Sequence, residues 1–75
     1  MPRLRPLPFR TVERRLLAAG FARHSQRGSH VKFVRVVGGQ TRVVIVPHHH
    51  EVAAGTIRSI IQQAGLTPDQ FDQLD

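Results

Sequence analysis

Apolar and polar positions follow a helical spacing near both ends of this 75-residue chain and a strand-like pattern in its middle. In residues 12–19, apolar side chains recur every three to four positions, which is the spacing of one buried helix face. Thr11 is suited to be the N-cap, and Gly20 followed by Phe21 matches a helix that ends in a Schellman motif. The pattern therefore predicts a first helix of about nine residues.

The middle of the chain predicts antiparallel strands. Residues 31–37 and 41–46 are rich in β-branched side chains, which favour strands. Gly38-Gly39 lies between them and is a hairpin signal, because a two-residue type I′ turn needs a positive φ at both positions. A shorter polar strand over residues 22–25 is expected to precede this hairpin.

A two-residue turn would also fix which residues of the hairpin lie opposite each other. It places Arg35 opposite Arg42, and His30 opposite Pro47. Like charges at opposite positions of a ladder repel each other, so the arginine pair should face water or a phosphate. Both faces of residues 31–37 contain apolar side chains, so the pattern leaves open which face covers the core.

Two further helices are predicted in the last third of the chain. Residues 57–64 carry the clearest helical stripe, with Thr56 as the expected N-cap and Gly65 just beyond the end. Residues 67–70, Thr-Pro-Asp-Gln, read as a capping box with proline at the first helical position. This box predicts a short last helix that carries Phe71 and Leu74.

The order α-β-β-β-α-α predicts an α+β fold, in which a three-stranded antiparallel sheet packs against helices on one face. Three prolines in residues 1–8 deny helix to that segment, so it is expected to form an extended N-terminal arm. Residues 9–75 are expected to form a single domain, because so short a chain has room for only one modest core.

Charge narrows the expected partners. The chain has 11 Lys and Arg against five Asp and Glu, and three of the five acids fall in the last seven residues. Such a basic body favours nucleic acid, although a basic surface without a specific partner is the simpler alternative. Phe21, Phe33 and Phe71 look like core residues, so recognition of RNA backbone and shape is expected to outweigh base stacking on aromatic rings.

Other features bear on location and cofactors. The chain has no apolar run near the roughly 20 residues that span a bilayer, and its start lacks the apolar stretch of a signal peptide. It has no cysteine, so it forms neither a disulfide nor a thiolate zinc site. We therefore expect a cytoplasmic protein with no cofactor and no membrane contact.

The most distinctive motif is Gly28-Ser29-His30, between the first helix and the hairpin. A Gly-Ser turn exposes backbone N–H groups that can receive a phosphate oxygen, and Arg23, Arg27 and Lys32 add positive charge around it. Histidine is suited to proton transfer near neutral pH, and RNA supplies its own nucleophile, the 2′-hydroxyl. On spacing alone a plain turn is the simpler interpretation, because a lone Gly-Ser-His is a weak motif.

Three consecutive histidines, at positions 48–50, follow the second hairpin strand. Successive side chains of an extended segment point in alternating directions, so at most two of the three could bind one metal ion. No cysteine pair is present to complete a tetrahedral site, and we expect no metal here. A solvated loop or a place beside a nucleic-acid site are the alternatives.

Four stretches, taken in this order, resemble the HicA toxin family, small mRNA-cleaving toxins of bacterial type II toxin–antitoxin systems. They are residues 16–21 (LLAAGF), Gly28-Ser29-His30, residues 44–47 (VIVP) followed by His49, and residues 55–66 (GTIRSIIQQAGL). The resemblance covers about residues 7–75. Arg27 stands where the family commonly has lysine, and Ala53-Ala54 stands where lysine or proline is usual before Gly-Thr.

The resemblance implies a double-stranded-RNA-binding-domain-like fold, mRNA cleavage with His30 as the catalytic residue, and a HicB-like antitoxin as partner. It gives His48 and His50 no role. The residues expected to contact RNA are Arg23, Arg27, Gly28, Ser29, Lys32 and His49. The alternative function is a non-catalytic module of the same fold, which would bind double-stranded RNA without cutting it.

Overall fold

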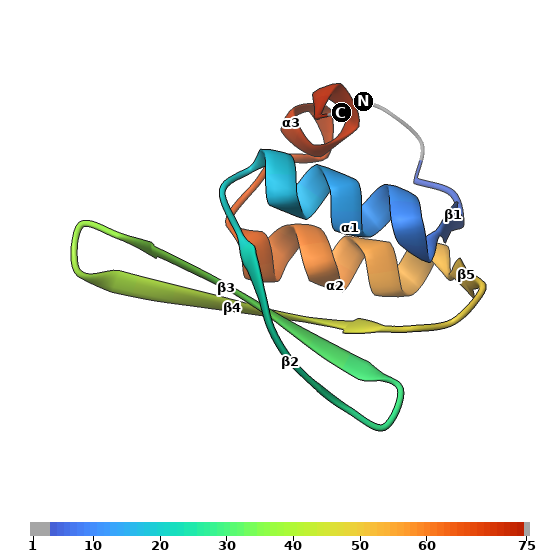
Figure 1. Ribbon diagram of the computed structural model, residues 1–75. Coiled ribbons are helices and arrows are strands. Elements are labelled where there is room, and N and C mark those ends of the chain that lie inside the picture. Colours follow the sequence, from blue (N-terminus) through green and yellow to red (C-terminus); the bar gives the residue numbers. More distant parts are fainter. Residues whose placement is uncertain (1–3, 75) are drawn as a thin grey trace.

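Helices cover one face of a three-stranded antiparallel sheet in the computed structural model, which describes residues 4–74 (Figure 1). In chain order the elements are β1 (Leu7–Pro8), α1 (Phe9–Ala18), β2 (Ala22–Arg27), β3 (His30–Val37), β4 (Gln40–Pro47), β5 (Glu51–Val52), α2 (Ala54–Ala64) and α3 (Pro68–Gln73). The large sheet has the order β2-β3-β4, and β1 pairs with β5 in a separate ribbon. The predicted α+β fold is confirmed. Within residues 4–74, no helix is long and apolar enough to cross a membrane.

The β3–β4 hairpin has the predicted register. Gly38 and Gly39 have φ values of 59° and 77°, both positive as a type I′ turn requires. His30 lies opposite Pro47, at the far end of the ladder from this turn. Because side chains alternate between the faces of a strand, this register decides which residues of the hairpin meet the helices.

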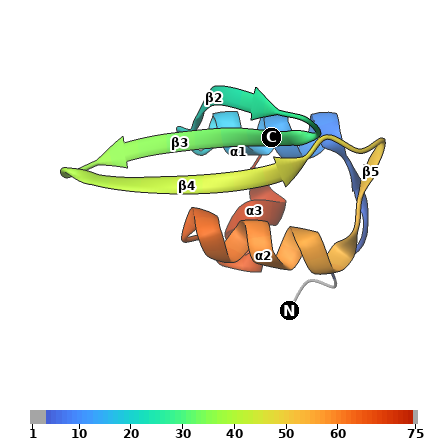
Figure 2. The ribbon, with the colours of Figure 1, turned by 90° about the horizontal axis from the view of Figure 1, so that it is seen from below.

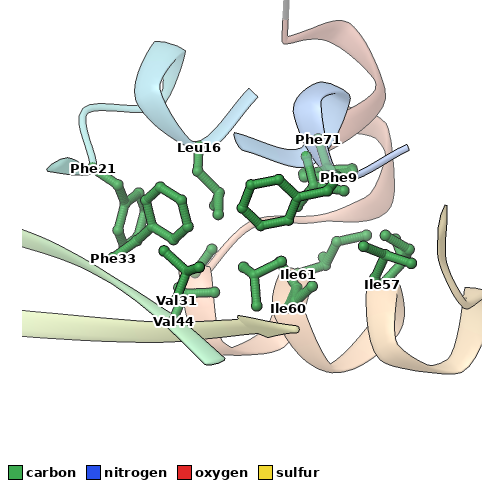
Figure 3. Packing of buried hydrophobic residues seen from close by; sticks show 14 residues of the cluster. Phe9, Leu16, Phe21, Val31, Phe33, Val44, Ile57, Ile60, Ile61 and Phe71 are labelled. Atoms are coloured by element: carbon green, nitrogen blue, oxygen red, sulfur yellow. The ribbon is translucent and has the colours of Figure 1, made fainter. Parts of the chain in front are cut away.

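The helix-facing side of the sheet forms the core, which settles the question that the sequence left open. The hairpin contributes four fully buried side chains, Val31, Phe33, Val44 and Val46. They pack against apolar side chains of the helices and against the ring of Phe21 (Figure 3). The helix residues of this cluster are Phe9, Val12, Leu16, Ile57, Ile60, Ile61, Ala64 and Phe71. Within residues 4–74, no helix lies on the opposite face of the sheet (Figures 1 and 2).

Both long helices end as predicted. The Phe21 N–H donates to the Leu16 carbonyl at 3.0 Å, and Gly20 between them has a φ of 95°. The end of α2 repeats this arrangement, since the Leu66 N–H donates to the Ile61 carbonyl at 3.1 Å. These are the bonds of a Schellman motif, which returns the chain sharply after each helix. The predicted capping box that starts α3 is also present.

The predicted helix starts are wrong by three residues. Thr11 and Thr56 lie inside the first turns, because α1 begins at Phe9 and α2 begins at Ala54 with no side-chain cap at either end. The reason is the ribbon in which β1 pairs with β5: each of its strands runs almost directly into a helix and fixes where that helix begins. Part of the expected N-terminal arm thus pairs as β1, and its residues 1–3 lie outside the described chain.

Arg35 and Arg42 lie opposite each other as predicted, but on the helix side of the sheet. The Arg35 side chain passes beside Gly20, at the end of α1. The Arg42 guanidinium lies beside Gly65, with its Nη1 3.4 Å from the Gln63 carbonyl. Helix C-termini carry partial negative charge on unpaired carbonyls. Arg42 is exposed and so faces water as expected, but the sequence did not indicate that each arginine also lies beside a helix end.

The end of α2 also covers the free edge of β4. The Gln63 side chain accepts a hydrogen bond from the Ile45 N–H through its Oε1, at 3.0 Å. β4 is an edge strand of the large sheet, and unpaired edge amides invite pairing with other chains. Gln63 thus satisfies one edge amide while its helix packs on the core.

The contact between Arg42 and the end of α2 predicts a position-specific glycine requirement. Replacing Gly65 (φ of 73°) with alanine places a Cβ 2.5 Å from Arg42 Cζ, so the guanidinium must move away. We expect Gly65→Ala to lower the unfolding free energy by ~1–2 kcal/mol, because side chains disfavour this left-handed conformation. Thermal unfolding measures the change, at about 4–8 °C per kcal/mol for a domain of this size.

Gly55→Ala is the matched control in the same helix. A Cβ at Gly55 meets no atom within 4 Å, and this glycine has no positive φ. We expect its melting temperature to stay equal or rise, because alanine is the better helix former. Equal stability of the two variants would contradict the assignment of Gly65 to a strained position.

Candidate nucleic-acid site

Gly28 and Ser29 form a two-residue turn between β2 and β3, closed by Arg27 opposite His30. Gly28 has a φ of 58°, whereas Ser29 has no positive φ, as in a type II′ turn with glycine at its first central position. A Cβ at Gly28 would meet no atom within 4 Å, so glycine is needed there for its backbone conformation. The Gln26 Nε2 donates to the Gly28 carbonyl at 3.0 Å and braces the turn.

His30 lies on the uncovered face of the sheet, close to two cations of the same face. The neighbouring position Val31 is buried against the helices, so the His30 side chain points the opposite way. Arg27 and Pro47 flank His30 on the two neighbouring strands. The next row on this face carries Lys32, so His30 has one cation opposite it and another two residues along.

The three-histidine segment meets the Gly-Ser turn. The backbone N–H of His48 donates to the Ser29 carbonyl, and the His49 N–H donates to the Pro47 carbonyl at 2.9 Å. These bonds hold the chain after β4 against the turn before β3. The structure therefore places His49 in the segment next to His30, as the register of the ladder predicts.

A stacked pair of rings connects this segment to the start of α1. The imidazole of His48 lies over the ring of Phe9, with ring centroids 4.0 Å apart and an interplanar angle of 24°. The stack borders an open pocket of about 490 Å³, which is lined by Pro8, Phe9, Arg10, His48, His49 and His50. The hairpin register predicted that His48 lies close to His30, but not that Phe9 and Arg10 meet it, because no spacing in the chain indicates that residues so far apart meet.

Arg23 lies apart from this cluster. It sits opposite Phe33, toward the other end of β2 from the turn. Its guanidinium donates to Glu13 on α1 at 2.9 Å and to the Gln26 side chain at 2.7 Å. The structure thus brings together Arg27, the Gly-Ser-His turn, Lys32 and the His49 segment, and it leaves Arg23 paired on the helix side.

The charged and titratable groups of the site are all at the surface, since the core of residues 4–74 contains no buried polar or charged residue. His30 and Arg27 are exposed, and Lys32 is half-buried. Within these described residues, no group of three or more His, Asp or Glu is arranged to hold a metal ion. The chemistry that the site offers is proton transfer by histidine beside cations and turn amides, on a face open to a large ligand.

Comparison with protein families identifies the family of this chain. A family model described as the HicA toxin of bacterial toxin-antitoxin matches residues 9–66, a range that contains α1, the whole large sheet and α2. A search of curated proteins finds no match. The family match covers well over half of the chain and includes both the Gly-Ser-His turn and the three-histidine segment. The chain therefore belongs to the HicA family, the toxins of bacterial toxin–antitoxin systems.

Proposed function

We propose that this protein is the toxin of a toxin–antitoxin pair and acts in the cytoplasm as an mRNA-cleaving endoribonuclease, with His30 as its catalytic residue. The observation that carries the proposal is the placement of His30 on the open sheet face, with Arg27 opposite it and Lys32 two residues along. An exposed histidine between two cations can approach a phosphodiester and exchange protons with it. The family membership of the chain supports the same activity.

The proposed reaction needs no nucleophile from the protein, because RNA carries one. His30 takes the proton of the 2′-hydroxyl, and the 2′-oxygen attacks the adjacent phosphorus. The bond between phosphorus and the 5′-oxygen breaks, and the 5′-oxygen takes the proton back from His30 to become a hydroxyl. The products are a 2′,3′-cyclic phosphate and a 5′-hydroxyl end. One acid or base of this kind typically contributes about 10²–10⁴-fold to a rate, which is sufficient for a slow toxin.

The groups around His30 have supporting roles in this proposal. Arg27, Lys32 and the backbone amides of Gly28 and Ser29 hold the phosphate and stabilise the negative charge that builds up on it. His49, on the neighbouring segment, contacts the RNA and assists the proton transfer. Arg23 adds positive charge at the other end of β2, where its ion pair with Glu13 already uses part of that charge.

A HicB-like antitoxin is the proposed protein partner, and it would cover the uncovered face of the sheet. This face carries exposed apolar side chains at Val36, Val43 and Ile45 as well as the cations near His30. A partner that offers apolar and acidic groups fits such a mixture.

We expect the product of an adjacent small reading frame to co-purify with this chain and to protect β3 and β4 from hydrogen exchange. Exchange protection confined to the helices would contradict this placement of the partner.

His30→Ala tests the catalytic assignment. We expect cleavage of mRNA by the purified protein to fall by about 10²–10⁴-fold, because the proton acceptor is lost. The melting temperature should stay unchanged, since the His30 side chain is exposed. Growth and mRNA integrity in a tightly controlled host provide the same comparison in cells. His24→Ala, which removes another exposed histidine, is the matched control and should leave cleavage intact.

Cleavage by His30→Ala at the wild-type rate would overturn the assignment. The alternative function, a module that binds double-stranded RNA without cutting it, predicts a different pair of results. Neither protein would cleave RNA, and both would bind duplexes with the same salt dependence.

The position of Arg27 opposite His30 predicts that RNA binding depends on positive charge at the turn. We expect Arg27→Ala to weaken RNA binding and to reduce the salt dependence by about one phosphate contact. Arg27→Lys should retain most of the affinity, because it keeps the positive charge. Arg58→Ala is the control: Arg58 is exposed on α2, which packs on the opposite side of the sheet from His30. Equal losses for Arg27→Ala and Arg58→Ala, measured by titration at two salt concentrations, would indicate a general effect of net charge and no contact at the turn.

A further inference from the structure

We infer that the pocket bordered by Phe9 and His48 binds a nucleobase of the RNA, from a nucleotide next to the phosphate at His30, by stacking the base on the His48 imidazole. This inference rests on the proposed RNA substrate. It assigns a role to His48, Phe9 and Arg10 that neither the sequence pattern nor the family resemblance provides.

Both rings of the stack are held in place by the surrounding structure. Phe9 belongs to the hydrophobic core and is only 7% exposed, so its ring is held in place by packing. His48 is exposed, and one face of its imidazole lies against the Phe9 ring with centroids 4.0 Å apart. The backbone of His48 is also held, by its hydrogen bond to the Ser29 carbonyl. The other face of the imidazole is therefore available to a flat ligand at little cost in side-chain entropy.

The size and lining of the pocket fit a nucleotide. Its volume of about 490 Å³ lies within the usual range for small-ligand sites, about 300–1,000 Å³. Arg10 supplies a positive charge for a phosphate oxygen, and His49 and His50 supply ring nitrogens that can hydrogen-bond to a base edge or a ribose hydroxyl. A simple anion site would not need the ring stack, whereas base recognition in single-stranded RNA regularly uses one.

The pocket is near enough to His30 to serve the same RNA strand. His30 pairs directly with Pro47, and His48 is the next residue along the chain. The Cα atoms of His30 and His48 are therefore within about 10 Å of each other, from the spacing of paired strands and of consecutive residues. A single strand that places a phosphate at His30 can place a neighbouring base on His48 without leaving this end of the sheet.

The test is the affinity for a non-cleavable RNA, so that binding is measured apart from catalysis. The probe is a fluorescent 2′-O-methyl octanucleotide, compared with a base-free ribose-phosphate chain of the same length. We expect His48→Ala to weaken binding of the octanucleotide by at least about fivefold, the equivalent of ~1 kcal/mol of stacking. His48→Phe should retain the affinity, because it keeps an aromatic surface. Binding of the base-free chain should be the same for all three proteins.

Several results would overturn the inference. Unchanged binding of the octanucleotide by His48→Ala would remove His48 from the RNA site. A loss for both His48→Ala and His48→Phe, or an equal loss with the base-free chain, would mean that His48 acts through its charge or hydrogen bonds. His24→Ala controls for the loss of a histidine, and thermal melting confirms that each variant is folded. Base-dependent binding together with an absence of RNA cleavage would contradict the proposed enzymatic function and leave the base subsite standing.

Discussion

A two-residue turn at Gly38-Gly39 closes the β3–β4 ladder, and the register of that ladder positions both the core and the candidate site. Phe33 and Val44 are paired, so a shift of β3 by one residue against β4 would leave Val44 on the helix side, turn Phe33 to the open face and bring His30 to the helix side. The observed register buries these apolar side chains and leaves His30 opposite Pro47 on the open face. The same pairing holds the three-histidine segment next to the Gly-Ser-His turn, at the end of the sheet away from the glycines.

The N-termini and the C-termini of α1 and α2 are fixed by different interactions. At their C-termini, α1 and α2 end in Schellman motifs, and Arg35 and Arg42 from the sheet lie against these ends. At their N-termini the helices have no side-chain caps and are started by the β1–β5 ribbon. The ribbon brings the first turn of α1 close to the three-histidine segment (Figures 1 and 2). The pocket at Phe9 and His48 is a consequence of this pairing between β1 and β5, which lie more than 40 residues apart in the chain.

Much of the fold followed from local pattern. The helical stripe of α2, the Gly38-Gly39 turn and the capping box at Thr67 are encoded within a few residues each, so the sequence predicted them correctly. The helix starts were mispredicted because Thr11 and Thr56 look like caps locally, while the β1–β5 pairing that sets the real starts is a contact between distant segments. The placement of Arg35 and Arg42 was missed for the same reason: the sequence shows their mutual repulsion, and it does not show the helix ends that receive them.

In the candidate site, too, local features could be predicted from the sequence, whereas contacts between distant segments could not. The neighbourhood of His30, Arg27 and Lys32 follows from turn position and strand pairing, which a sequence can indicate. The stack of Phe9 on His48 depends on how a helix start and a loop meet in space, which no local pattern in the sequence indicates. The ion pair between Arg23 and Glu13 could not be foreseen from local charge either, because it joins β2 to the face of α1.

In the proposed reaction, His30 removes the proton of the RNA 2′-hydroxyl, and the 2′-oxygen attacks the adjacent phosphorus. The decisive measurement is the chemical nature of the RNA ends, determined by mass spectrometry after incubation with the purified protein and a chelator. We expect a 2′,3′-cyclic phosphate and a 5′-hydroxyl, and no cut at a position where a single 2′-deoxy nucleotide removes the nucleophile. A 3′-hydroxyl with a 5′-phosphate, or continued cleavage at the 2′-deoxy position, would contradict it.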